Sequence, residues 1–266
     1  MIQSRATIIL AAGKGKRMNS DLAKVLHPIA GRPLIDHVCS ALRGLGLQRT
    51  IVVIGQQGEA VESYLSGKFP ELNLSFVWQK EQLGTGHAVM QAEDAMRGFN
   101  GTVVVTAGDV PLVTNSTLRA LFERHERSSA SVTCLSAEFP DPTGYGRILR
   151  EGKSDKLGRI VEHKDAPEEI RAIREINSGI FAFDSTELFS ALSEIGCDNT
   201  QGEYYLTDVV EVLNRRGRPC RVLRAENSDE VRGVNSIEQL KELEALFGGR
   251  PAGLARATDG AQARVR

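Results

Sequence analysis

The feature that most constrains the fold is a stretch near the amino terminus, residues 7–27. It reads TIILAAGKGKRMNSDLAKVLH, an apolar run that breaks into a loop rich in glycine and cations. The β-branched and aliphatic residues 7–10 predict a short buried strand. Ala11, Ala12 and Gly13 follow. Because these residues are too small to shield the main chain, a ligand can lie directly against the backbone there.

Positive charge collects directly behind these small residues. The cations are Lys14, Lys16, Arg17 and Lys24. Exposed amide groups and fixed cations at the carboxyl end of a strand suit a polyanion such as a nucleoside triphosphate. The glycine pattern alone is weak evidence, because it has neither the third glycine of the dinucleotide fingerprint nor the Gly-Lys-Ser/Thr ending of a P-loop. A tight turn with solvated lysines remains the alternative for the loop taken by itself.

The same stretch resembles the LxxGxGxRM…PKVLH signature of the sugar-1-phosphate nucleotidyltransferases. Here it reads LAAGKGKRM from Leu10 and AKVLH from Ala23. The family usually has proline at the position of Ala23, so the backbone before Lys24 is less constrained here. The resemblance implies that Arg17 and Lys24 are catalytic. It assigns nucleotide binding to Leu10, Ala11, Ala12, Gly13 and Lys24.

Composition places the chain among ordinary globular proteins. With 266 residues, 41% hydrophobic and 25% charged, it can bury a full core as one large or two unequal domains. The net charge of −1 gives no bulk attraction to nucleic acid. No apolar run approaches the roughly 18 residues that span a membrane, and there is no signal-peptide pattern, so we expect a cytoplasmic protein. The four cysteines form no Cys-x-x-Cys pair, which predicts reduced, mostly buried thiols.

Strand and helix signals alternate through the first half of the chain. Predicted strands follow at residues 50–54, 74–78, 102–105 and 131–135, and predicted helices begin at Pro33 and span 58–65 and 85–96. This order predicts a Rossmann-like α/β fold, a mostly parallel sheet with helices on both faces and its ligand loops along one edge. Beyond residue 135, turns and shorter strands predict a small β-rich part, with a strand at 159–162. A helix face at 206–213, a strand at 220–223 and a helix at 237–247 complete the pattern.

Two loops after predicted strands carry further chemistry. In QKEQLGTGH, residues 79–87, an amide and small groups stand at a helix start, although the pattern by itself also fits an ordinary helix cap. The loop resembles the uracil-reading loop of the bacterial N-acetylglucosamine-1-phosphate uridylyltransferases, which assigns Gln79, Gly84 and Thr85 to the base.

The second loop, AGDVPL, places Asp109 at a strand end beside Gly108. An acidic residue there can hold Mg²⁺ or cap a turn. The resemblance makes Asp109 a metal ligand and Gly108 part of the nucleotide site.

Later segments extend the resemblance, which covers about residues 6–247. DPTGYGRI (141–148), EHKDA (162–166) and EINSGI (175–180) resemble the sugar pocket of these uridylyltransferases, although they also fit plain hairpins. The family pattern assigns sugar binding to Gly146, Glu162 and Asn177. The turn GVN makes Asn235 the second Mg²⁺ ligand, with a structural turn as the alternative, and Ser236 and Gln239 predict a capping box for the last helix.

The resemblance implies that the chain transfers a uridylyl group from UTP to N-acetylglucosamine-1-phosphate, with Mg²⁺. The product, UDP-N-acetylglucosamine, is a precursor of peptidoglycan and lipopolysaccharide. The same chemistry with glucose-1-phosphate or dTTP, and a non-catalytic sugar-nucleotide sensor, are the alternatives. We expect a nucleotidyltransferase domain over residues 1–247, with a nucleotide-binding half at about 1–137 and a sugar-binding half at about 138–247. Residues 248–266 are expected to be a disordered tail, because they lack both a core-forming pattern and the hexapeptide repeats of the bifunctional members' acetyltransferase.

Overall fold

The apolar run near the amino terminus forms the strand around which the sheet is built. The computed structural model describes residues 3–18 and 20–248. In it β1 (Arg5–Ala11) pairs in parallel with β4 (Leu47–Ile54) on one side and with β6 (Thr102–Ala107) on the other. Strand β5 (Leu74–Trp78) continues the parallel pairing beyond β4. Ile8 and Ile9 point to opposite faces and are both fully buried, as expected for a strand covered on both sides.

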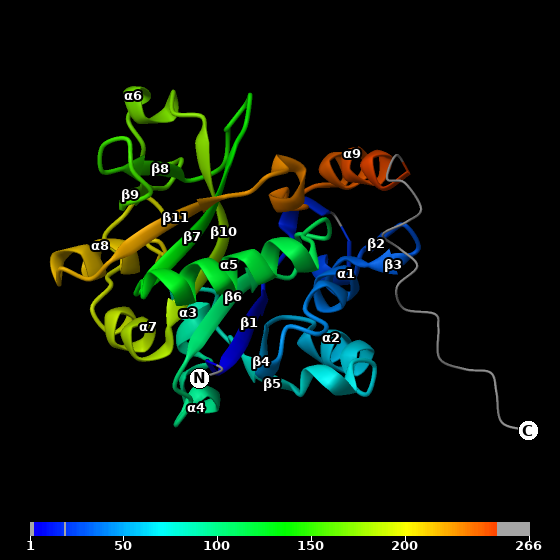
Figure 1. Ribbon diagram of the computed structural model, residues 1–266. Helices are drawn as coiled ribbons and strands as arrows, with labels where there is room; N and C mark the ends of the chain where they lie inside the picture. The colour runs from blue at the N-terminus through cyan, green and yellow to red at the C-terminus, as the bar shows by residue number, and fades with distance from the viewer. Residues whose placement is uncertain (1–2, 19, 249–266) are drawn as a thin grey trace, which may run out of the picture.

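The second half of the sheet contains one reversed strand. Strand β10 (Glu175–Asp184) pairs antiparallel with both β6 and β7 (Val132–Glu138), and β11 (Cys220–Arg224) pairs in parallel with β7 at the edge. The full order is β11-β7-β10-β6-β1-β4-β5 (Figure 1). A short hairpin of β8 (Arg147–Arg150) and β9 (Leu157–Val161) attaches to β10, and β2 (Pro28–Ile29) pairs separately with β3 (Arg32–Pro33). The predicted mostly parallel sheet with a small β-rich part is confirmed.

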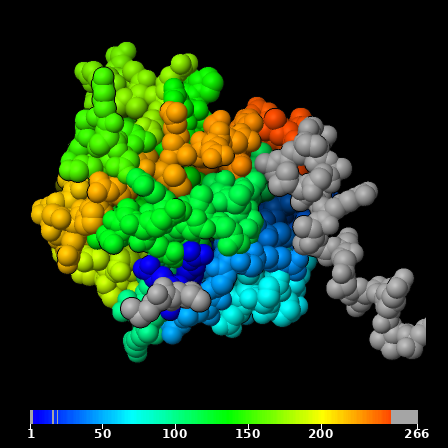
Figure 2. Space-filling view, in the orientation of Figure 1, coloured from blue at the N-terminus to red at the C-terminus, as the bar shows by residue number. Residues whose placement is uncertain are grey.

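Helices cover both faces of this sheet. The face of Ile8 packs against α3 (Thr85–Met90), α4 (Glu93–Met96), α7 (Ser185–Leu192) and α8 (Asp208–Arg215). The face of Ile9 packs against α1 (Leu34–Ala41), α2 (Gly58–Leu65) and α5 (Asn115–Ser128). The short α6 (Glu168–Arg171) buries none of its side chains. In the space-filling view, the green segment that includes α5 lies between the blue and cyan segments and the orange segment near the top (Figure 2).

The last helix, α9 (Ile237–Gly248), belongs to a third, smaller cluster. Its residue Leu243 packs with Met18, Leu112 and Val234. Met18 lies in the glycine-rich loop, Leu112 ends the predicted metal loop, and Val234 precedes Asn235. This cluster therefore holds together three loops that the sequence assigns to one site.

One predicted helix is wrong in extent. Residues 85–96 form two helices, because the backbone tightens at residues 91 and 92, where N–H groups reach back three residues to Ala88 and Val89. Helices α5 and α7 were not predicted. Apart from Gly248, the expected tail 248–266 lies outside the described residues. Within the described part, no helix is long and apolar enough to cross a membrane. Cys39, Cys134 and Cys220 are free and buried, as expected, whereas Cys197 is exposed.

Candidate active site

The loop after β1 is a tight glycine turn anchored by a buried methionine. Gly15 has a φ of +54°, which favours glycine, and its carbonyl accepts the N–H of Met18 at 2.8 Å. Met18 is buried, whereas Gly13 and Arg17 are exposed. Arg17 makes no hydrogen bond or ion pair with any described residue, so its guanidinium is available to a ligand. Of the three small residues, Gly13 is thus exposed beside a free cation, whereas Ala11 and Ala12 are buried.

Lys24 brings three distant segments together. It begins the short turn η2 (Lys24–Leu26), whose other residues, Val25 and Leu26, are buried. Its ammonium group pairs with the Asp109 carboxylate and lies 3.2 Å from the Asn235 Oδ1 atom. Both side chains of the ion pair are largely buried. The structure therefore places the predicted catalytic lysine between the two predicted metal ligands.

The backbone around Asp109 and Asn235 is held by several bonds. Val234 donates its N–H to the Asp109 carbonyl at 3.0 Å. Half of the predicted capping box is present, since Ser236 accepts the N–H of Gln239 at 3.3 Å, but Gln239 does not bond the N–H of Ser236. Gln239 reaches back one residue beyond the cap and accepts the N–H of Asn235 at 2.8 Å. The start of α9 therefore fixes the position of Asn235.

The donor set at this point suits a hard divalent cation. A carboxylate and an amide oxygen are the ligand types that Mg²⁺ prefers. Among the described residues, no group of three or more His, Cys, Asp or Glu side chains could hold a metal. The two oxygens converge on one cation, the Lys24 ammonium, so the pocket is built for positive charge. With two ligands from the protein, a bound ion would take its remaining ligands from phosphate and water.

Gln79 is buried at the entrance of the predicted base loop. Its Nε2 donates to the Gly84 carbonyl at 3.0 Å and lies 3.1 Å from the His87 Nδ1 atom. This leaves Oε1 as an acceptor with no partner among the described residues. Gly84 has a φ of +110°, and a Cβ atom there would lie 2.5 Å from the Tyr204 carbonyl oxygen, so glycine is required. The side chain of Thr85 accepts the N–H of Leu206 at 3.1 Å.

Gly146, Glu162 and Asn177 also meet in space. A Cβ atom on Gly146 would lie 3.3 Å from both carboxylate oxygens of Glu162, so glycine lets the carboxylate approach the backbone. Asn177 donates its N–H to the Gly146 carbonyl at 2.9 Å. Burial raises the pKa of the Glu162 carboxyl, and a hydrogen bond from Thr207 opposes that rise.

Tyr145 joins this sugar loop to the GVN turn that carries Asn235. It directly precedes Gly146, and its hydroxyl is hydrogen-bonded to the backbone of Gly233, two residues before Asn235. Burial raises the pKa of the Tyr145 hydroxyl, and its ring packs edge-on against Phe139 at 5.0 Å. The predicted phosphate, metal and sugar residues therefore lie around one edge of the sheet.

Several residues that shape this site were missed at the sequence level. Gly55 is one: a Cβ atom there would lie 2.8 Å from the Ala12 carbonyl oxygen and 3.0 Å from Gln82. Tyr145 and Thr207 stand inside segments already identified in the sequence, but only the fold shows what they contact. A cavity of about 320 Å³ also lies beside Glu162, lined by acidic residues that include Asp165 and Asp208. Burial and the nearby Glu211 raise the pKa of Asp208 to about 6.

Comparison with solved structures supports the fold. The crystal structure of a UDP-glucose pyrophosphorylase complexed with UDP-glucose superposes with a TM-score of 0.74, covering 93% of this chain and 100% of that chain. The sequence identity is 20%, so this likeness shows the fold alone.

Sequence relatives are much closer. The bifunctional protein GlmU of Syntrophotalea carbinolica is 48% identical over 242 residues, which are 91% of this chain and 51% of that protein. The bifunctional protein GlmU of Halalkalibacterium halodurans is 43% identical over 246 residues, 92% of this chain and 53% of that protein. The chain thus spans about half the length of the curated relatives it matches. Residues 7–176, more than half of the chain, match the MobA-like NTP transferase domain. The chain therefore belongs to the family of MobA-like NTP transferase domains.

Proposed function

We propose that this chain is a sugar-1-phosphate uridylyltransferase that transfers a uridylyl group from UTP to N-acetylglucosamine-1-phosphate, releasing pyrophosphate. The observation that carries the proposal is the meeting of Lys24, Asp109 and Asn235 at the sheet edge where the glycine-rich loop is open. The similarity to the GlmU proteins over nearly the whole chain supports the same activity. The chain works on small phosphorylated substrates in the cytoplasm, without nucleic acid or a membrane.

The reaction is an in-line displacement at the α-phosphorus of UTP. An oxygen of the sugar phosphate forms the new bond, the bond from the α-phosphorus to the β-phosphate oxygen breaks, and pyrophosphate leaves with that electron pair. The attacking phosphate has a second pKa of about 6 and is already ionised at neutral pH, so no general base is needed. The obstacle is the approach of two anions. Catalysis therefore comes from positioning and charge neutralisation, with Lys24 on the reacting phosphates and Arg17 on the leaving group.

Asp109 and Asn235 would hold Mg²⁺, which neutralises phosphate charge when bound. The Lys24 ammonium now satisfies these two oxygens, so metal binding would release Lys24 to the phosphates. Gly108 connects this loop to the glycine-rich loop, because it donates its N–H to the Leu10 carbonyl at 2.9 Å. This bond joins the loop proposed to hold the metal to the strand that leads into the loop proposed to hold the nucleotide.

The other proposed site residues bind the two ends of the product, the uracil base and the sugar. Gln79, Gly84 and Thr85 read the uracil, and the unpartnered Oε1 of Gln79 suits the N–H donor of that base. Glu162, Asn177 and the Gly146 backbone bind the sugar, since a carboxylate and an amide can bond neighbouring hydroxyls and an acetamido group. The nucleotide-binding half then spans about residues 1–137 and the sugar-binding half about 138–247.

A pyrophosphate-release assay tests this function. The purified chain is given Mg²⁺ with UTP or dTTP, and with N-acetylglucosamine-1-phosphate or glucose-1-phosphate. We expect UTP with N-acetylglucosamine-1-phosphate to have the highest kcat/KM. A higher kcat/KM for glucose-1-phosphate or for dTTP would reassign the substrate. Binding without turnover of any pair would indicate a sugar-nucleotide sensor instead.

A further inference from the structure

One segment of the chain touches both the base loop and the sugar loop. It comprises residues 204–207, between α7 and α8, and we call it the bridge segment. On the base side, Tyr204 donates its N–H to the Leu83 carbonyl at 2.8 Å, and its own carbonyl accepts the N–H of Gly86 at 2.7 Å. Leu206 donates its N–H to the Thr85 hydroxyl at 3.1 Å. The bridge segment is thus bonded to Leu83, just before α3, and to the first two residues of α3.

On the sugar side, two side chains of the bridge segment hold two carboxylates. The Thr207 hydroxyl donates to the Glu162 Oε1 atom at 3.1 Å, and the Tyr205 hydroxyl donates to the Asp165 Oδ2 atom at 3.1 Å. Thr207 is 5% exposed. Although it stands at the N-cap of α8, its side chain makes no capping bond. Its hydroxyl is therefore directed to Glu162 and not to the helix.

Glu162 needs such a partner because its surroundings disfavour negative charge. Burial is the largest cause that raises its pKa. The carboxylates of Asp208 in α8, Asp165 in its own loop and Glu203 beside the bridge segment raise it further. Within the described residues, Thr207 provides the side-chain hydrogen bond that opposes these effects.

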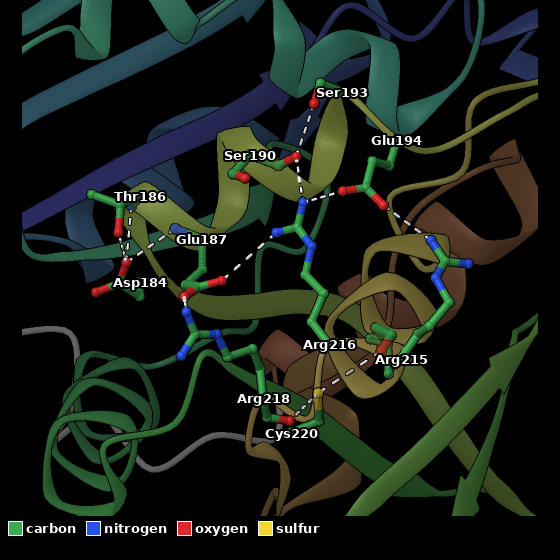
Figure 3. Close-up of polar contacts among 11 residues, drawn as sticks. Asp184, Thr186, Glu187, Ser190, Ser193, Glu194, Arg215, Arg216, Arg218 and Cys220 are labelled. Atoms are coloured by element: carbon green, nitrogen blue, oxygen red, sulfur yellow. Dashed lines mark hydrogen bonds and ion pairs between the residues drawn. The ribbon is translucent and has the colours of Figure 1, made fainter.

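Helix α8, whose N-cap is Thr207, is joined to the region of α7 by ion pairs. Three arginines at or just beyond the end of α8 pair with Glu187 of α7 and with Glu194, which follows α7, as Figure 3 shows. Arg218 lies 2.9 Å from Glu187, Arg215 lies 3.1 Å from Glu194, and Arg216 contacts both glutamates. The buried Val209, Val210 and Leu213 pack α8 into the core on this face of the sheet. The bridge segment, which leads into α8, can therefore act as a fixed support for Glu162.

We propose that Thr207 is a positioning residue of the sugar subsite, whose hydroxyl holds the Glu162 carboxylate toward the sugar hydroxyls while the bridge segment fixes it relative to the base loop. The inference rests on the proposed function, because it takes Glu162 to bind the sugar. A carboxylate held in this way forms charge-assisted bonds to sugar hydroxyls, which are stronger than neutral ones. Thr207 itself does not need to touch the substrate.

The test compares Thr207→Val, which keeps the shape and removes the donor, with Thr207→Ser, which keeps the donor. KM for the sugar phosphate and for UTP is measured between pH 6 and 8.5. For Thr207→Val we expect the sugar KM to rise about tenfold while the UTP KM stays within twofold, the order of effect of losing one bond to a charged group. The rise should grow as the pH falls, because Glu162 then protonates at a higher pH than in the wild type. Thr207→Ser should restore the wild-type sugar KM and its pH profile.

A matched control is Thr186→Val, since the Thr186 hydroxyl also donates to a carboxylate, that of Asp184, but at the start of α7. It should leave both KM values unchanged. A Thr207→Val variant with a wild-type sugar KM across the pH range, or one whose UTP KM rises equally, overturns the inference. If wild-type protein turns over the sugar phosphate and Glu162→Gln raises its KM while Thr207→Val does not, the inference fails alone. If wild-type protein does not turn over the sugar phosphate, the proposed function fails and the inference falls with it.

Discussion

The singly charged ammonium group of Lys24 occupies a position that would suit a divalent metal ion. Its ammonium satisfies the Asp109 carboxylate and the Asn235 amide oxygen, two groups 126 positions apart in the chain. A metal ion and the lysine would compete for the same oxygens, so a bound metal would leave the Lys24 ammonium free for phosphate. Because of this competition, replacing Lys24 should strengthen metal binding and weaken catalysis.

Lys24→Ala should therefore bind divalent ions more tightly than the wild type in the absence of nucleotide, while kcat falls by about two to four orders of magnitude. The control is Arg17→Ala, which should lose kcat to a similar extent without changing metal affinity, because Arg17 contacts neither Asp109 nor Asn235. Calorimetric titration with Mn²⁺ or Mg²⁺ and steady-state kinetics measure the two quantities. Equal metal affinities in the wild type and both variants would refute the competition.

Asp109 and Asn235 should contribute unequally to the ion. Asp109→Asn removes the only charge that this pair of ligands offers, whereas Asn235→Ala removes a neutral donor. We expect Asp109→Asn to raise the Mg²⁺ concentration for half-maximal rate, and to lower kcat, far more than Asn235→Ala does. A wild-type Mg²⁺ dependence of the Asp109→Asn variant would remove Asp109 from the metal site.

At the scale of elements, hydrophobic runs predict the bounds of some strands and helices and miss others. The bounds of β5 (Leu74–Trp78) and α2 (Gly58–Leu65) agree with the prediction to the residue. The amphipathic helix α5 was missed because its exposed face is highly charged and its start depends on Thr114, whose hydroxyl accepts the N–H of Thr117. The break between α3 and α4 was missed because residues 91 and 92 have no glycine or proline to mark it.

The sequence named many of the residues of the candidate site but not the contacts between them. The resemblance named residues that the fold does bring together, such as Gly146, Glu162 and Asn177. The pairing of Lys24 with Asn235 depends on how α9 returns to the glycine-rich loop, and local sequence patterns do not carry that information. The bond from Thr207 to Glu162 is hidden for the same reason.

Helix α9 offers a test of how an element supports the metal site. Gln239→Ala removes the acceptor for the Asn235 N–H, which should lower stability by about 1 kcal/mol and raise the Mg²⁺ requirement in the direction of Asn235→Ala. Gln239→Glu keeps an acceptor and is the other usual capping-box residue, so it should behave as the wild type. Thermal unfolding and Mg²⁺-dependent kinetics measure both effects. An unchanged Mg²⁺ requirement in Gln239→Ala would show that Asn235 is held without this cap.

At the scale of the whole molecule, one sheet runs across the two proposed halves. Strand β10, from the second half, pairs with β6 and β7 of the first half, and the clusters on both faces include residues from each. The residues predicted to bind the base, phosphate, metal and sugar lie around the resulting shared edge.

The buried His125 should make this shared core sensitive to acid. It is 3% exposed, its Nδ1 lies 3.0 Å from the Thr133 hydroxyl, and burial lowers its pKa to about 4. The unfolded chain binds a proton below about pH 6.5, whereas the folded chain does so only near pH 4, so stability falls as the pH drops between these values. The loss is up to about 3 kcal/mol from this group.

Urea unfolding at pH 7, 5.5 and 4 measures this effect. The free energy of unfolding should fall less steeply with decreasing pH in His125→Gln than in the wild type. Asp208 acts in the opposite sense, because its pKa is raised to about 6, so it destabilises the fold as the pH rises from about 4 to 6. Parallel pH profiles of the wild type and His125→Gln would contradict the assignment to His125.

The most direct measurement of the proposed chemistry follows labelled phosphorus from UTP to the products. With UTP labelled at the α-phosphorus, N-acetylglucosamine-1-phosphate and Mg²⁺, we predict that the label appears in UDP-N-acetylglucosamine, and that label placed at the γ-phosphorus appears in an equal amount of pyrophosphate. Both transfers should require the sugar phosphate and should be lost in Lys24→Ala. Label from the γ-phosphorus appearing as inorganic phosphate, or α-label released without a sugar phosphate, would contradict uridylyl transfer at this site.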